Sequence, residues 1–132
     1  MECIIDMEAK VNDKTIKLTS YDLPGQDDSR RYLTVSLEDK VIGFVQMTQI
    51  DLNMSKGCFS LEITDEDERG KGYGTAALAL VKEYAGKELG ISLLATIIGS
   101  DDQIRIQMLE TQGFRCFAEQ NGCRYYLIGG LN

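Results

Sequence analysis

Hydrophobic and polar residues alternate along much of the first half of the chain. A repeat of two residues is typical of strands that bury one face of a sheet and expose the other. This repeat predicts strands at residues 15–19, 32–37, 41–50 and 58–63, and a hairpin partner for the first of them at 3–7. Turns are expected at Asn12-Asp13 and Glu38-Asp39, a bulge at Gly43 and a loop around Pro24-Gly25.

The repeat lengthens to helical spacing after the glycine-rich segment that ends near residue 75. Apolar residues recur at positions 77, 80, 81 and 84, and Gly90 then predicts the end of a helix. Residues 91–98 are almost wholly apolar, which predicts a strand that is buried on both faces.

The last part of the chain predicts one more helix and a hairpin. Ser100-Asp101 is a favourable N-cap pair, so a helix is expected from there to about Gln112. Asn121-Gly122 then predicts a tight turn between strands at 114–119 and 124–128. Four or five antiparallel strands, a helix, a strand, a helix and a hairpin indicate an α+β (mixed α/β) fold on one central sheet. The 132 residues are expected to form a single domain, 1–132.

Composition and charge exclude several classes of function. A net charge of −7 argues against a general nucleic-acid binder, and it leaves open either simple solubility or attraction of a cationic partner. The chain has no histidine, which removes Ser-His-Asp chemistry and nearly every zinc site, so no metal is expected. Apolar runs are too short to span a membrane, and the acidic start is unlike a signal peptide, so a cytoplasmic location is expected.

The four cysteines are too far apart for a CxxC pair. Cys3, Cys58, Cys116 and Cys123 are therefore expected to be buried thiols that pack as small apolar residues. A disulfide between Cys116 and Cys123 across the last hairpin is the alternative.

The glycine-rich segment has the layout of a phosphate site. A strand ending at Ile63 leads into the run Arg69, Gly70, Lys71, Gly72, Tyr73, Gly74 and Thr75, which opens a helix. The first N–H groups of a helix lack partners, the helix dipole adds positive charge there, and glycines let an anion approach the backbone. Arg69 and Lys71 can add charge-assisted contacts. The segment therefore predicts a diphosphate cradle.

Known phosphate-binding motifs can be tested against this run. It departs from the P-loop, because Gly72 stands where Ser or Thr is needed, and from the dinucleotide motif, because Thr75 stands where glycine is needed. It matches R-x-x-G-x-G/A in full. The segment closely resembles the cofactor-binding motif of the GNAT N-acetyltransferase superfamily, and most of all the branch with ribosomal-protein-alanine and spermidine acetyltransferases. Residues 100–114 are similar to the late helix of that family, which ends in Gly-Phe.

The resemblance implies a ligand and a set of roles. Acetyl-CoA is the expected cosubstrate, and an amine is the expected acceptor. The negative net charge of the protein would suit a cationic amine. Ile63 and Thr64 are expected on a splayed strand whose backbone pairs with the pantetheine arm, with 69–75 around the pyrophosphate and Asp102 on the pantetheine side. In the family the amine attacks the thioester directly, so the protein orients the pair, polarises the carbonyl and accepts a proton.

Two departures from the family pattern bear on catalysis. Leu109 stands where the family usually has a tyrosine acid, and leucine cannot donate a proton to sulfur. The stretch 20–31 is too short and polar for the two helices that normally follow the first strand, so a reduced helical region and an open acceptor side are expected. An open side suits a bulky acceptor such as a protein N-terminus, and a second copy of the chain could also close it as a homodimer.

Glu62 is the predicted general base, acting through water, because it lies on the strand beside the expected thioester. The alternative is a solvent-exposed strand glutamate without a role. Other candidate proton carriers are Ser100, Tyr125 and Tyr126, and the acids of 65–68 either form a solvated loop or meet a cationic acceptor. The competing hypothesis for the whole chain is a GNAT-fold module that binds acyl-CoA with little catalysis.

Overall fold

The computed structural model describes residues 2–22 and 27–132, so the predicted Pro24-Gly25 loop lies outside the described residues. Eight strands form one sheet with the order β1-β2-β3-β4-β5-β6-β8-β7. In chain order the elements are β1 (Glu2–Val11), β2 (Lys14–Asp22), β3 (Arg31–Leu37), β4 (Lys40–Asp51), β5 (Lys56–Ile63), the short 3₁₀ helix η1 (Glu66–Glu68), α1 (Tyr73–Glu83), the π-helical turn η2 (Tyr84–Glu88), β6 (Leu93–Gly99), α2 (Gln103–Thr111), β7 (Arg115–Gln120) and β8 (Cys123–Ile128). All neighbouring strands are antiparallel except β5 and β6. The predicted α+β class and mostly antiparallel sheet are confirmed.

The predicted turns join the hairpins of the sheet. Asn12-Asp13, Glu38-Asp39 and Asn121-Gly122 have positive φ at both residues, which is the geometry whose twist matches that of the flanking strands. The predicted bulge is also present, because the register between β3 and β4 passes from Gly43 to Val41 and skips Ile42. Gly43 is needed there, since a Cβ atom at this position would collide with the carbonyl oxygen of Glu62 in β5.

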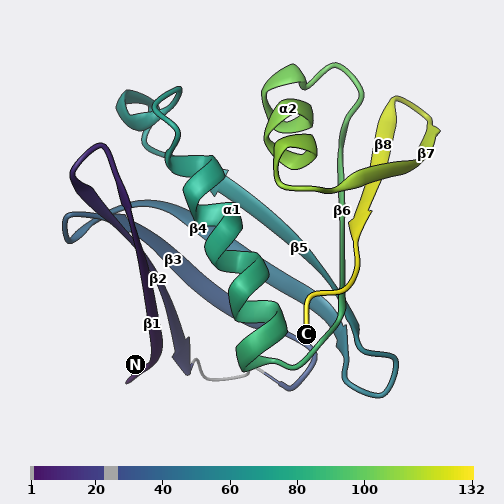
Figure 1. The fold of residues 1–132 in the computed structure, drawn as a ribbon, viewed down its shortest axis with the longest axis horizontal. Coiled ribbons are helices and arrows are strands. Elements are labelled where there is room, and N and C mark those ends of the chain that lie inside the picture. Colours follow the sequence, from purple (N-terminus) through teal and green to yellow (C-terminus); the bar gives the residue numbers. More distant parts are fainter. Residues whose placement is uncertain (1, 23–26) are drawn as a thin grey trace.

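One face of the sheet carries the hydrophobic core. α1 lies across this face (Figure 1) and packs Ala77, Leu78 and Val81 against the apolar side chains of β2 to β5. Within the described residues no helix precedes η1, which confirms the predicted reduction of the N-terminal helical region. In the described part of the chain the opposite face of β1 to β5 therefore has no helix over it, and the described side chains on that face are mainly polar.

The expectations for β6 and α2 are corrected. β6 begins at Leu93, and its buried positions alternate with half-buried ones and with the exposed Ile97, so it is not buried on both faces. Ile97 is 60% exposed because no helix of the described residues covers the open face of the sheet. The cap of α2 is Asp102 rather than Ser100-Asp101, and the helix runs from Gln103 to Thr111. Asp102 takes this role because its side chain accepts a hydrogen bond from the Arg105 N–H, at 3.1 Å.

The cysteines also differ from expectation. Cys58, Cys116 and Cys123 are free thiols, so the alternative of a Cys116–Cys123 disulfide is wrong. Cys116 is exposed rather than buried, because β7 is the edge strand of the sheet and most of its side chains face solvent, while Cys58 and Cys123 are half-buried. The side chain of Cys3 lies outside the described residues.

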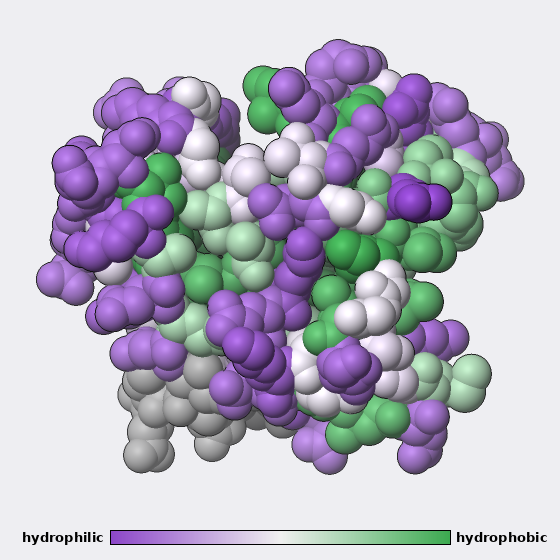
Figure 2. All heavy atoms as spheres, viewed as in Figure 1, coloured by the Kyte–Doolittle hydropathy of each residue, from purple (hydrophilic) through white to green (hydrophobic). Residues whose placement is uncertain are grey.

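Figure 2 shows hydrophilic residues gathered over the β1–β2 turn and the loop before α1, and more hydrophobic ones around β6 and β8. In the described part of the chain no helix is long and apolar enough to cross a bilayer.

Candidate active site

The parallel strands β5 and β6 separate and leave a cleft between them. They pair only where Lys56, Gly57 and Cys58 meet Leu93, Leu94 and Ala95, and from there they diverge toward α2 (Figure 1). The predicted splayed pair is confirmed. The opening holds a cavity of about 390 Å³, which β4, β5, β6 and α2 line.

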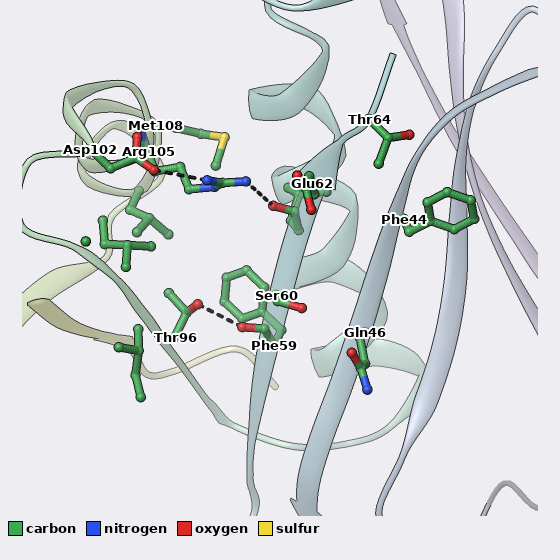
Figure 3. A pocket seen from close by; sticks show the side chains of 15 residues that line it. Phe44, Gln46, Phe59, Ser60, Glu62, Thr64, Thr96, Asp102, Arg105 and Met108 are labelled. Carbon is green, nitrogen blue, oxygen red and sulfur yellow. Dashed lines mark hydrogen bonds and ion pairs between the residues drawn. The ribbon is translucent and has the colours of Figure 1, made fainter. Parts of the chain in front are cut away.

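Beyond the point of divergence, the edge of β5 faces the cleft with no strand beside it. The carbonyl oxygens of Phe59, Leu61 and Ile63 point there, and each accepts a hydrogen bond from a side chain. The donors, in the same order, are the Thr96 hydroxyl at 2.7 Å, Arg105 Nη2 at 3.4 Å and Arg69 Nε at 2.8 Å. Figure 3 shows the first two of these contacts crossing from β6 and α2 to β5.

In an antiparallel strand the N–H and C=O groups of one residue point to the same side, and the next residue points to the other side. The N–H groups of Leu61 and Ile63 therefore face the cleft together with their carbonyls. Thr64 is turned the other way, since its N–H donates to the carbonyl of Ile42 in β4 at 2.8 Å. The structure thus brings the backbone of Ile63 to the cleft, while the N–H of Thr64 is used inside the sheet.

The glycine-rich run forms a loop at the open end of this edge and leads into α1. Gly70 and Gly72 have φ of 75° and 89°, a left-handed conformation that favours glycine. Gly72 is the N-cap of α1, and no side chain caps the helix. The first N–H groups of α1, on Tyr73, Gly74 and Thr75, therefore keep the donor capacity that a diphosphate can use.

The cations beside this loop are paired with the acids of residues 65–68. Lys71 donates to Glu68 at 3.0 Å, and Arg69 Nη1 lies 4.0 Å from Glu66. Asp65 pairs with Lys40 at 2.8 Å and also accepts from the N–H of Asp67 at the start of η1. The hydrogen bond to Glu68 raises the pKa of Lys71, and the one from Lys40 lowers the pKa of Asp65, so both stay charged at neutral pH. Asp65, Glu66 and Glu68 thus form ion pairs with the cations beside the loop.

Glu62 lies on β5 with its exposed side chain on the open face of the sheet. Its carboxylate has no hydrogen bond or ion pair to any of the residues that the structure describes. Phe44 of β4 is its cross-strand neighbour and is 53% exposed, and the next pair along the strands is Gln46 with Ser60. Figure 3 shows these four residues on β4 and β5 beside the cleft. A carboxylate, an aromatic ring and two neutral polar groups thus lie together next to the splayed edge.

α2 forms the opposite wall of the cleft. Asp102 lines it and pairs through Oδ2 with Arg105 Nη1 at 3.0 Å. Leu109, at the usual tyrosine position, is 1% exposed and belongs to the core. Arg105 was not identified from the sequence. The spacing could have indicated it: Arg105 is three residues after Asp102 and four before Leu109, so the three residues lie on the same face of a helix.

The other candidate proton carriers do not line the cleft. The hydroxyl of Tyr126 donates to Glu110 at 2.7 Å, and burial raises the pKa of this tyrosine. Tyr125 packs against Phe117, with ring centroids 6.1 Å apart. The Oγ atom of Ser100 is buried and has no partner among the described residues.

Comparison with known proteins agrees with this geometry. The chain superposes on the N-acetyltransferase PseH from Campylobacter jejuni with a TM-score of 0.70 and 19% identity, over 79% of this chain and 70% of that one. A complex of PseH with acetyl coenzyme A gives a TM-score of 0.70 at 18% identity, again over 79% and 70%. The dodecameric spermidine N-acetyltransferase from Vibrio cholerae gives 0.72 at 18% identity, over 79% and 67%. At these identities the likeness shows the fold.

No curated protein sequence matches the chain. A family profile does match the chain, from residue 5 to residue 114, which is most of the length of the chain. The matched region contains the strands, the loop and the helices that form the cleft. The chain therefore belongs to the acetyltransferase (GNAT) family and is an acyltransferase with acetyl-CoA as its cosubstrate.

Proposed function

We propose that the chain, as one cytoplasmic domain of residues 1–132, transfers the acetyl group of acetyl-CoA to a primary amine of a small molecule or a protein. The observation that carries this proposal is the continuity of the free β5 edge with the uncapped N-terminus of α1. One long ligand with amide groups and a diphosphate can use both features, because the first offers backbone pairing and the second offers N–H groups and helix dipole.

On the donor side, the residues of this chain suit acetyl-CoA. The N–H groups at 72–75, with Arg69 and Lys71, would hold the pyrophosphate, while Leu61 and Ile63 offer backbone groups to the pantetheine arm. Asp102 would contribute to the pantetheine side indirectly, because its carboxylate orients Arg105. When bound, acetyl-CoA supplies an acetyl carbon activated as a thioester. An N–H of the β5 edge can polarise its carbonyl.

On the acceptor side, Glu62 has the central role. Its free carboxylate and the exposed face of Phe44 attract an ammonium group by charge and by cation–π contact. The amine must be neutral to attack, and we propose that Glu62 takes its proton through a water molecule. The amine nitrogen then bonds to the acetyl carbon as the carbon–sulfur bond breaks, the electron pair of that bond stays on sulfur, and the second proton of the nitrogen leaves to solvent water.

Two acceptor classes come first in a test. The neighbour from Vibrio cholerae is a spermidine acetyltransferase, which supports polyamines as one class. The open face of β1 to β4 has no helix over it in the described residues, which supports a larger acceptor such as the N-terminus of a basic peptide. A second copy of the chain could also close that side, as a homodimer.

The test is titration calorimetry with acetyl-CoA, followed by an amine panel of polyamines and basic peptides. Micromolar binding with CoA release on at least one amine is the expected result. Binding without turnover of any amine would favour the competing hypothesis of an acyl-CoA-binding module, for which buried Leu109 is the argument. No binding at millimolar cofactor would refute the proposed function.

A further inference from the structure

Arg105 is the one cationic side chain among the described residues that line the cleft. It projects from α2 one turn before Leu109 and reaches the carbonyl oxygen of Leu61 on β5, so its guanidinium spans the opening (Figure 3). The other charged groups that line the cleft are Asp102 on α2 and Glu62 on β5. Asp102 bonds Arg105 directly, whereas Glu62 has no partner among the described residues.

The two contacts of the guanidinium differ in strength. The bond from Nη1 to Asp102 measures 3.0 Å and orients the group, as a charge-assisted pair does. The bond from Nη2 to the Leu61 carbonyl measures 3.4 Å, close to the limit for a hydrogen bond. The second donor is therefore held in the cleft by a weak contact, which a stronger, negatively charged acceptor can replace.

Acyl transfer from a thioester produces such an acceptor. When the amine nitrogen bonds to the acetyl carbon, the carbon–sulfur bond breaks and its electron pair stays on sulfur. Two protons leave the ammonium form of the amine: in the proposed function Glu62 takes the first through water before attack, and the second leaves the nitrogen to solvent water after the bond forms. Neither proton is delivered to the sulfur. Leu109 has no proton to give, and the cleft-lining residues include no tyrosine, lysine or cysteine.

We propose that Arg105 stabilises the leaving thiolate in place of the missing acid. A guanidinium stays protonated and cannot act as an acid, but it offers a fixed positive charge and N–H donors to the developing anion. Its side chain is 40% exposed, so water only partly screens this charge. The inference rests on the proposed function, because it needs a CoA thioester in the cleft.

The experiment measures the pKa of the CoA thiol on the protein, by ultraviolet absorbance of the thiolate against pH, and so needs no acceptor. In the wild-type complex this pKa should lie below that of free CoA. Arg105→Gln should raise it by about one unit, the effect of removing a nearby opposite charge. Arg105→Lys, which keeps the charge on a different geometry, should give an intermediate value. Glu62 and Asp102 are present in every variant, so the differences report on residue 105.

Arg115→Gln is the matched control, because it removes the same charge from an exposed position on β7 that does not line the cleft. It should leave the thiol pKa unchanged. Equal thiol pKa values in wild type and Arg105→Gln, with CoA bound to both, would overturn the inference but not the proposed function. The inference also fails if Arg105→Gln only tightens CoA binding, since Arg105 would then merely block the cleft. Failure of the wild type to bind CoA would overturn both.

Discussion

The glycine at the cap of α1 offers a direct test of the phosphate cradle. Gly72 has φ of 89°, and a Cβ atom there would meet nothing nearer than Val11 Cγ1 at 4.0 Å. Gly72→Ala therefore adds backbone strain rather than crowding, at a cost of about 1–2 kcal/mol in the free energy of unfolding. The loop can relieve that strain by returning φ to negative values, which turns the neighbouring N–H groups away from the open end of the cleft.

The expected loss of affinity follows from those N–H groups. A hydrogen bond to a charged group is worth about 1.5–3 kcal/mol, so misdirecting one of them should weaken acetyl-CoA binding roughly 10- to 100-fold. Titration calorimetry measures the dissociation constant, and urea denaturation measures the stability of the same samples.

Gly90→Ala is the matched control. Gly90 also has positive φ, 69°, with no other atom within 4 Å of an added Cβ, but it follows η2 at the far end of the α1 region. Both substitutions should lower stability to a similar extent, and only Gly72→Ala should weaken binding. Equal dissociation constants for the two variants would show that the N-terminus of α1 does not hold the diphosphate.

Three further substitutions test separate parts of the site. Glu62→Gln should lower kcat on the order of 10²-fold with acetyl-CoA affinity unchanged, and an unchanged kcat would remove Glu62 as the base. Glu68→Gln frees Lys71 and should tighten CoA binding in low salt, whereas looser binding in calorimetry would contradict the pairing argument. Thr96→Val leaves the Phe59 carbonyl without its donor at the base of the cleft and should cost about 1–3 kcal/mol in urea denaturation; no change would mean that water replaces the hydroxyl.

The strands of the first half were predictable because only one of their faces is buried. One-sided burial leaves an alternation in the sequence, and it placed strands at 32–37, 41–50 and 58–63, close to the observed β3, β4 and β5. β6 was mispredicted for the converse reason. Its apolar run suggested two covered faces, but no helix of the described residues covers the face that presents Ile97. Apolar residues stand on both faces of β6, so the alternation that would reveal one-sided burial is missing from this strand.

Site residues were predictable as far as they depend on local backbone geometry. The run 69–75 forms the expected glycine loop before α1, although its use by a phosphate stays a prediction. The pairing of Lys71 with Glu68 was missed, and a spacing of three residues in a loop gives no guide to side-chain direction. Asp102 was expected near the cleft, but its bond to Arg105 was not predicted, because it depends on α2 starting at Gln103 with Asp102 as its cap.

The sequence by itself determined the features that depend on a few neighbouring residues. Asn12-Asp13 and Asn121-Gly122 accept positive φ, and Gly70 and Gly72 set the loop before α1, because these conformations are governed by local sterics. Only the tertiary structure decided where β5 and β6 part and what crosses the gap. Arg105 and Leu61 are 44 residues apart in sequence and meet because α1 returns the chain to the sheet beside β5. Such a contact depends on packing over the whole domain, which no local pattern encodes.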